Sequence, residues 1–163
     1  MLISNQMESY FITEKFTIAP KPLYREEYLK EMFEVAEDEA VKALELEQCN
    51  AILAFIAKKG DDAANLQPLV YVLIKYAQTL QEYNKIVINY SKEHKLTHIV
   101  AMEGEKLLLA NTYRTTDEKS VLYFVSLVAQ QVMFNPHLTK VHVYGEMEPE
   151  GIQLLERYFA PNA

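Results

Sequence analysis

Three strand-like segments in the second half of the 163-residue chain are joined by very short connections, and this spacing restricts the folds open to it. The segments are residues 86–90, 96–103 and 106–113, all rich in apolar side chains. A polar loop over residues 91–95 joins the first two, and Gly104-Glu105 makes a tight turn between the last two. Because parallel neighbours need a crossover of about a dozen residues or more, these connections predict an antiparallel three-stranded meander.

A helix, a fourth strand and a second helix are predicted to follow the meander. Thr115 and Glu118 form a capping-box pattern, which predicts a helix over residues 115–134 with Thr115 as its N-cap. Asn and Pro end this pattern, and the β-branched segment at residues 141–145 predicts the fourth strand. Proline then opens a last amphipathic helix over residues 149–159.

The first half is predicted to hold a smaller set of elements. One segment, residues 41–48, fits two interpretations. Its Ala, Leu and Glu content favours a helix, whereas the alternation of Leu44 and Leu46 with glutamates favours a strand. We favour the strand, paired as a hairpin with the apolar run that follows Asn50. The expected elements are strands at about 10–19, 41–48 and 51–57, and helices at about 23–35 and 66–80.

Charge and cysteine content exclude several classes of protein. The 16 Lys plus Arg and 23 Asp plus Glu give a net charge of −7, which disfavours binding to nucleic acid and to anionic membranes. The longest mostly apolar stretch, residues 66–77, is too short to cross a bilayer, and residues 1–8 lack a basic leader. Cys49 is the single cysteine, which fits a reducing compartment. We expect a cytoplasmic protein with no nucleic-acid partner and no membrane insertion.

Candidate chemical groups are sparse, and we predict no catalytic residue, no metal site and no cofactor. Ser91 and His94 have the residue types of a nucleophile and a base, but no orienting acid accompanies them. His94 and His98 have metal-ligand spacing for a helix, but we place them at the junction of a loop and a strand. His98 and His142 could lie on neighbouring strands, where two hydrogen-bonded sheet histidines are the simpler interpretation.

Three longer segments carry a resemblance to a known family. They read KFTIAPKPLY (residues 15–24), HIVAMEGEKLLLANTYRTTDEKSVLYFVSLVAQQ (residues 98–131) and VHVYGEM (residues 141–147). Together they resemble an uncharacterised Bacteroidetes family, a domain of unknown function placed with the actin-like ATPases. The resemblance runs from about Ser9 to the last residue. Members of that family are longer and carry a further sheet ahead of the KFTIAP-like strand.

The resemblance implies an α/β fold of the actin-like ATPase, ribonuclease-H-like kind with a mixed sheet. The strand–strand–strand–helix–strand–helix order over residues 86–159 is that of one half of this fold. Residues 83–163 would then form a ribonuclease-H-like second subdomain. Residues 1–82 would form a partial first subdomain, because the family's N-terminal sheet has no counterpart here.

The resemblance also directs attention to the nucleotide site of actin-like ATPases, which this sequence matches poorly. Their phosphate turn uses a carboxylate that works through magnesium, and glycine that admits the phosphates to the backbone. Here the matching segment offers Asn89 and Ser91, with no Gly or Asp beside them. The adenosine position offers Gly145 followed by Glu146 and Glu148, whose charge would repel phosphates. The nucleotide site is therefore predicted to be degenerate.

Two functions from different classes remain at this stage. The first is a non-catalytic protein-interaction or scaffold module with an unknown protein partner, or as a homodimer. The 11 tyrosines suit such a surface, although tyrosines at sheet and helix edges are equally common. The second is that the chain is the C-terminal part of an ATP-binding actin-like ATPase or phosphotransferase.

Overall fold

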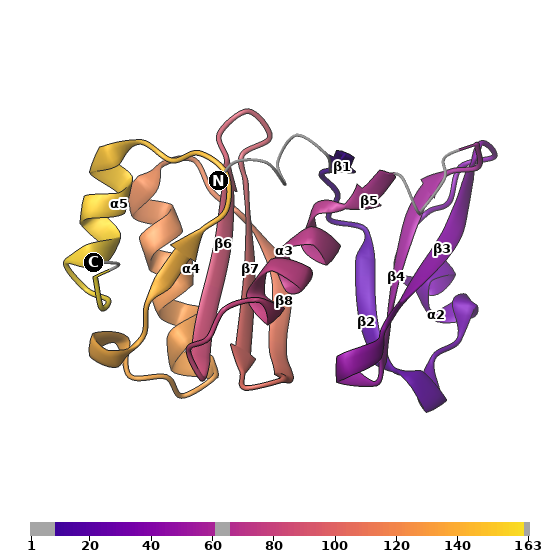
Figure 1. Cartoon of the computed structure of the whole chain (residues 1–163). Helices are drawn as coiled ribbons and strands as arrows, with labels where there is room; N and C mark the ends of the chain where they lie inside the picture. The colour runs from indigo at the N-terminus through magenta and orange to yellow at the C-terminus, as the bar shows by residue number, and fades with distance from the viewer. Residues whose placement is uncertain (1–8, 61–65, 162–163) are drawn as a thin grey trace. The chain divides into compact units, whose positions relative to one another are not determined.

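The computed structural model describes residues 9–60 and 66–161 of the chain (Figure 1). The chain divides into two compact units, Met1–Val72 and Leu73–Ala163. The boundary between them falls within helix α3 (Leu69–Gln78).

The first unit contains a three-stranded antiparallel sheet in the order β2-β4-β3. A separate pair of short parallel strands, β1 and β5, completes its strand content among the described residues. The bounds are β1 Ser9–Phe11, β2 Phe16–Pro20, η1 Lys21–Leu23, α2 Glu26–Met32, β3 Glu39–Leu46, η2 Glu47–Cys49, β4 Ala51–Lys58 and β5 Leu66–Pro68.

The β3–β4 hairpin confirms the strand interpretation of residues 41–48. Leu44 pairs with Leu53, and Leu46 pairs with Ala51. Between the strands Asn50 takes a left-handed conformation with φ of 50°, which asparagine tolerates better than most residues. The alternation of leucine with glutamate therefore fits an edge strand with one face toward solvent.

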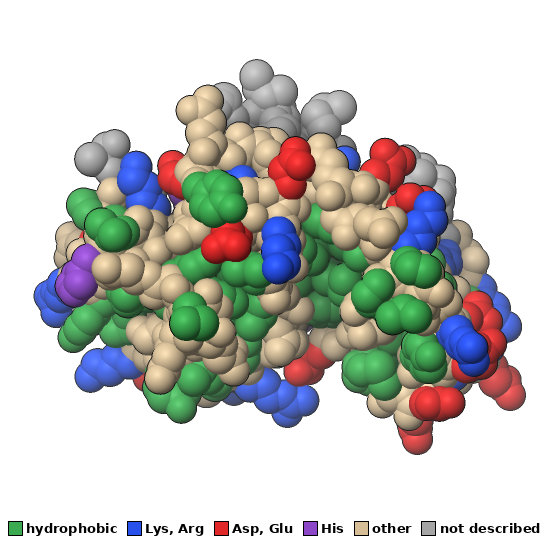
Figure 2. All heavy atoms as spheres, turned by 90° about the horizontal axis from the view of Figure 1, so that it is seen from below, with side chains coloured by type: hydrophobic (Ala, Val, Ile, Leu, Met, Phe, Trp, Pro, Cys, Tyr) green, Lys and Arg blue, Asp and Glu red, His purple; other side chains and the backbone are tan. Residues whose placement is uncertain are grey.

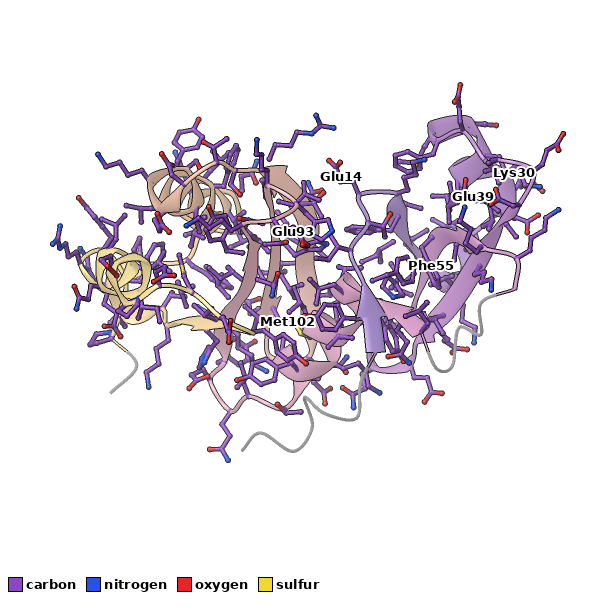
Figure 3. The ribbon with its side chains drawn as sticks, turned by 90° about the horizontal axis from the view of Figure 1, so that it is seen from above. Glu14, Lys30, Glu39, Phe55, Glu93 and Met102 are labelled. Carbon is purple, nitrogen blue, oxygen red and sulfur yellow. The ribbon has the colours of Figure 1, made fainter. Side chains whose placement is uncertain are left out.

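The core of the first unit forms where α2 packs on its sheet. Leu29 of α2 is fully buried against Ala54 and Ile56 of β4. Phe55 lies between these two in the sequence, so its side chain points to the opposite face of the strand, where it is also fully buried (Figure 3). Partly buried side chains complete the cluster around Leu29: Tyr24, Phe33, Val35 and Val41.

The second unit has a four-stranded mixed sheet in the order β8-β7-β6-β9. The first three strands form the predicted antiparallel meander, and β9 pairs with β6 in parallel. The order strand–strand–strand–helix–strand–helix is thus confirmed. The bounds are β6 Asn84–Ser91, β7 Leu96–Glu103, β8 Lys106–Arg114, α4 Glu118–Gln131, η3 Pro136–Leu138, β9 Val141–Val143 and α5 Pro149–Glu156.

Helices α4 and α5 cover one face of this sheet (Figure 1). Alternate residues of β6, Ile86 and Ile88, point to that face and meet Ile99 of β7 and Val125 of α4 in one buried cluster. The two-residue period of the strands and the 3.6-residue period of the helix bring these apolar side chains together. Leu155 adds the contribution of α5 to the same cluster.

Several predicted elements of the first half were too long. The strand predicted over 10–19 is two strands, β1 and β2, with no strand at residues 12–15. The helix predicted over 23–35 is α2 alone, seven residues long. The helix predicted over 66–80 begins only at Leu69, because residues 66–68 pair with β1 as β5. Pro68 explains this start, since proline favours an extended residue before it.

The second half needs smaller corrections. The strand predicted over 141–145 ends at Val143, and Gly145 takes a positive φ of 91° that an extended strand does not allow. The helices predicted to reach residues 134 and 159 end at Gln131 and Glu156.

The N-cap of α4 is Asp117, so the prediction of Thr115 was wrong. Asp117 Oδ1 accepts a hydrogen bond from the Ser120 backbone N–H at 2.8 Å, and Ser120 Oγ accepts one from the Asp117 N–H at 3.1 Å. The hydrogen bonds that the backbone and side chain of Ser120 make to the Asp117 carboxyl hold its pKa below its ordinary value. Thr115 instead lies buried, with its hydroxyl 2.8 Å from that of Thr97 on β7.

Candidate functional site

The carboxyl ends of β6 and β9 lie side by side, and they bring together two of the residues predicted for the degenerate nucleotide site. Asn89 Nδ2 donates a hydrogen bond of 2.8 Å to the backbone oxygen of Tyr144. Gly145 follows directly, and a Cβ added there would lie 2.9 Å from Asn89 Nδ2. The Asn89 side chain therefore occupies the space beside Gly145 and donates a hydrogen bond to the backbone that follows β9. A ligand could not take this space without displacing the Asn89 side chain.

Ser91, the third predicted position, ends β6 and organises the turn that follows. Its Oγ lies 2.9 Å from His94 Nδ1 and accepts a hydrogen bond of 3.3 Å from the His94 backbone N–H. Lys95 completes the turn with a left-handed φ of 55°. No carboxylate of the described segments hydrogen-bonds to His94, so the pair lacks the orienting acid of a nucleophile–base arrangement. Glu93, which the turn also carries, is exposed (Figure 3).

The histidines do not form the pairs considered from the sequence. His98 of β7 lies opposite Asn89 of β6, while His142 of β9 lies opposite Val87. Strand β6 thus separates His98 from His142, so these two are not on neighbouring strands. His94 is exposed in its turn whereas His98 is fully buried. Within residues 9–60 and 66–161, no three His, Cys, Asp or Glu side chains are grouped so that they could hold a metal ion.

Several acidic groups lie near the carboxyl end of this sheet. Tyr90 is buried next to the N-terminus of α4, and burial raises the pKa of its hydroxyl, with the charges of Glu118 and Asp117 adding to the effect. Glu146 and Glu148 are exposed in the segment after Gly145. A polyphosphate placed here would face these carboxylates as well as the exposed lysines of the turn that follows β6.

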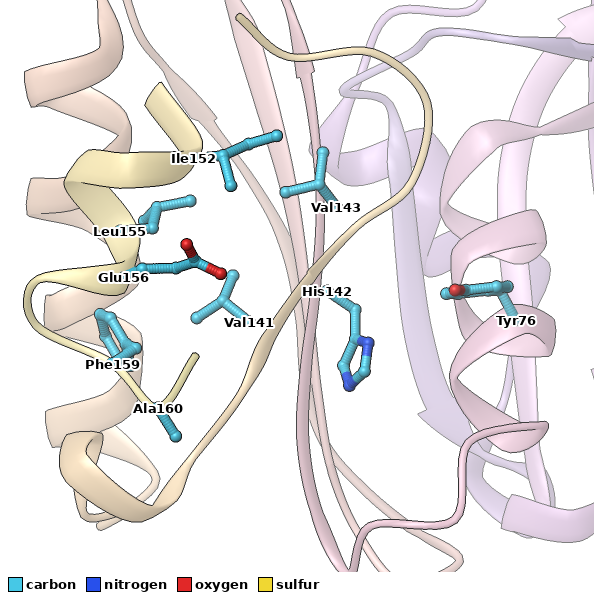
Figure 4. Close-up of a pocket in the computed structure, with 9 residues that line it drawn as sticks. All are labelled: Tyr76, Val141, His142, Val143, Ile152, Leu155, Glu156, Phe159 and Ala160. Carbon is cyan, nitrogen blue, oxygen red and sulfur yellow. The ribbon is translucent and has the colours of Figure 1, made fainter. Parts of the chain in front are cut away.

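A groove follows the outer edge of β9 (Figure 4). Its volume is about 350 Å³. Figure 4 shows His142 and Tyr76 on one side of β9, and Ile152 and Leu155 on the other. Because side chains from both faces line the groove, it lies at the strand's edge rather than within the core. The other apolar side chains that line it are Val141, Val143, Phe159 and Ala160.

Two contacts shape the His142 side of the groove. His142 Nε2 lies 3.0 Å from Glu82 Oε1, which orients the imidazole. Tyr76 of α3 meets Tyr144 edge to face, with ring centroids 5.3 Å apart. Reasoning from sequence missed this groove, because its position depends on which strand forms the sheet edge. The short valine-rich strand at residues 141–143 was its one available signal.

Comparison of the sequence with known protein families identifies the family of this chain. The sequence pattern of the protein family of unknown function DUF3822 matches residues 9–161. The chain belongs to the DUF3822 family. The earlier resemblance to an uncharacterised family placed with the actin-like ATPases is therefore confirmed. No curated protein matches this DUF3822 chain.

A solved structure supports the fold of this DUF3822 chain. It is a protein with an actin-like ATPase fold and unknown function from Bacteroides thetaiotaomicron VPI-5482. The TM-score is 0.72 at 19% sequence identity, and the match covers 93% of this chain. The chain spans 65% of the length of that protein. The α/β, actin-like fold predicted from the sequence is thus confirmed.

The surface of this DUF3822 chain has no single basic region on the face drawn in Figure 2. Lys and Arg side chains are scattered there among acidic and apolar ones. Across residues 9–60 and 66–161, no helix has both the length and the apolar character to span a bilayer.

Replacing Gly145 by alanine is expected to destabilise the protein by about 1–2 kcal/mol, because a side chain is strained at positive φ. The added Cβ would also press on Asn89 Nδ2. Urea denaturation followed by circular dichroism measures the change. The matched control is Gly60→Ala, since no atom of the described residues lies within 4 Å of a Cβ at Gly60. If the contact with Asn89 matters, the double variant with Asn89→Ala loses less stability than the sum of the single variants. Strict additivity would contradict that contact.

Proposed function

We propose that this chain is a non-catalytic protein-interaction or scaffold module built on an actin-like fold. The observation that carries the proposal is the groove along the outer edge of β9, where the half-buried apolar side chains of Val143 and Ile152 line the surface. Strand edges with unpaired backbone groups are common docking sites for other proteins. The Asn89–Tyr144 hydrogen bond supports the non-catalytic part, because it engages the side chain at the degenerate phosphate-turn position within the chain itself.

Calorimetric titration tests the absence of a working nucleotide site. We expect no measurable heat of binding when ATP and magnesium are titrated into the protein at millimolar concentration. The physical reason is that Asn89 and Ser91 supply no carboxylate for magnesium, while Glu146 and Glu148 repel phosphate. A titration with magnesium alone is the control. Tight, magnesium-dependent binding of ATP would overturn the proposal.

The proposal includes a cytoplasmic location, no cofactor, no nucleic-acid partner and a protein partner, a second copy of the chain included. The single cysteine and the charge of −7 support these points. It also keeps the division predicted from the sequence, with residues 83–163 as a ribonuclease-H-like subdomain and residues 1–82 as a partial first one. The four-stranded mixed sheet with α4 and α5 on one face supports that assignment.

A second candidate function follows from the length comparison. The solved actin-like neighbour is longer, since the present chain spans 65% of it. The chain would then be the C-terminal part of an ATP-binding actin-like ATPase or phosphotransferase. The reading frame upstream of the gene discriminates the two candidates. A strand followed by an Asp-containing, Gly-rich turn in that frame would favour the enzyme.

A further inference from the structure

We propose that the exposed side of α2 binds a basic amphipathic helix of another protein. This inference rests on the proposed interaction function and adds a second surface to it, on the first unit of the chain. Three observations carry it: an apolar ridge along α2, a hollow that continues this ridge, and a concentration of negative charge around both.

The apolar ridge consists of Tyr28 and Met32. These residues are four positions apart, so they lie one above the other on the same side of α2. Leu29 is the buried residue of this helix, whereas the exposed fractions of Tyr28 and Met32 are 43% and 55%. The short helix thus turns one apolar side chain toward its sheet and leaves two others in water.

A hollow of about 660 Å³ continues the ridge at the C-terminal end of α2. It forms because Phe33 takes an extended conformation, with φ of −138° and ψ of 150°, and carries the chain away from the helix. Phe33 and Val35 are partly buried against the Leu29 cluster, while Glu34 between them is exposed. Met32 lines the hollow as well as forming the ridge, so the two make one continuous surface.

Most of the net charge of the chain lies around this surface. Residues 26–39 contain seven acidic residues and one lysine, which gives a net charge of −6 out of −7 for the whole chain. The rest of the sequence is therefore nearly balanced. Burial raises the pKa of the Tyr24 hydroxyl, and the charges of Glu26 and Glu27 raise it further. Figure 2 shows acidic side chains beside apolar ones over the first unit.

Lysines near the surface leave much of this charge uncompensated. Lys30 pairs with Glu26 at 3.4 Å, one helical turn away. Glu31 and Glu34 line the hollow, and no ion pair among the described residues involves either of them. The other charged residues of the lining are Lys15, Lys30 and Glu39 (Figure 3).

These charges favour a basic partner over a second copy. If a symmetric dimer used this surface, the patch would face itself and bring glutamates of the two copies together. Lysine or arginine on another protein would instead be attracted to it. An amphipathic helix suits the ridge, because its own apolar side chains at four-residue spacing can pack beside Tyr28 and Met32. A large side chain that enters the hollow would remove apolar surface from water.

The test uses a fluorescein-labelled peptide of about four helical turns, with leucine on one face and lysine on the other. Fluorescence anisotropy measures its binding to the full chain. We expect saturable binding that weakens as salt is added, because salt screens exposed charges. One control peptide has the same residues in an order that scatters the leucines around the helix, and a second has glutamate in place of lysine. Both should bind about tenfold more weakly or worse.

Met32→Ala locates the binding site. Because Met32 is exposed, we expect an unchanged melting temperature but binding of the leucine–lysine peptide that is about fivefold to tenfold weaker. Met133→Ala is the matched control, since it truncates a methionine that is 88% exposed in the second unit. This control should bind the peptide as the unchanged chain does.

A charge variant tests the surface independently. The double substitution of Glu31→Gln with Glu34→Gln keeps the shape of the hollow and removes two charges from its lining. We expect it to weaken binding about threefold or more and to reduce the effect of salt. If Met32→Ala unfolds the chain, this variant still decides.

Equal binding of the scattered peptide, or no binding, would overturn the inference, since net charge alone would then account for any affinity. Binding that neither Met32→Ala nor the double glutamine variant weakens would also overturn it. A concentration-dependent dimer abolished by Met32→Ala would assign the surface to a second copy and overturn it as well. The calorimetric titration with ATP tests the non-catalytic function separately, so the two failures are distinguishable.

Discussion

Replacing Val125 by aspartate should unfold the second unit. Val125 is fully buried in the middle of α4, in the cluster that joins this helix to the sheet. The side chains of that cluster are apolar and aromatic, so a carboxylate placed among them would lose its hydration. The expected loss is roughly 3–5 kcal/mol or more of unfolding free energy. That loss approaches the whole stability of a typical domain, which is about 5–15 kcal/mol.

Thermal unfolding followed by circular dichroism measures this effect. The matched control is Ser126→Asp, which places the same charge one position along the helix on an exposed site. This control should shift the melting temperature little, because a solvated carboxylate carries no burial cost. A Val125→Asp protein as stable as the control would contradict the described packing of α4 on the sheet.

Replacing Leu29 by alanine should destabilise the first unit by about 2–5 kcal/mol. Leu29 is the fully buried residue of α2, and it packs on Ala54 and Ile56 of the sheet. Removing its side chain leaves a cavity that the short helix cannot close without losing its other contacts. Urea denaturation gives the change in free energy.

Met32→Ala is the matched control for Leu29→Ala. Met32 lies on the same helix but is 55% exposed, so its truncation removes little buried surface. We expect its effect to stay within about 0.5 kcal/mol. Equal losses for both variants would show that helix propensity, rather than packing on the sheet, determines the stability of α2.

The strands of the second half could be predicted closely because apolar residues mark them. Strand β7 matches the predicted residues, whereas β6 begins two residues earlier than predicted, at Asn84. Lys85 belongs to this extension although it is polar, because its Nζ reaches the backbone oxygen of Gly104 at 3.3 Å. Hydropathy cannot reveal a strand end whose residues are held by tertiary hydrogen bonds.

The cap of α4 shows a different limit. Two overlapping patterns compete within six residues: Thr115 with Glu118, and Asp117 with Ser120. Local sequence fits both, and the choice depends on Thr97, which engages the buried Thr115 hydroxyl. A partner eighteen residues away in the chain thus decides where the helix begins.

The candidate site was predicted only in part. Asn89 and Gly145 were selected because the resemblance matches them to the phosphate turn and the adenosine position, and the parallel pairing of β6 with β9 does bring them together. The groove along β9 was not predicted, because sheet order decides which strand lies at the edge. Its apolar residues are individually ordinary, and only their arrangement around Val143 makes them a candidate surface.

The pairing of β6 with β9 also bears on the order of folding. Short turns join β6 to β7 and β7 to β8, which pair as neighbours. Ile86 of β6 pairs with Val141 of β9 only after the chain has passed through β7, β8 and α4. Closing the longer loop costs more chain entropy, so we expect β9 to join the sheet after the meander has formed. The outer edge of β9 would then be the last part of this sheet to form. A protein that binds this edge would recognise finished chains and pass over those still folding.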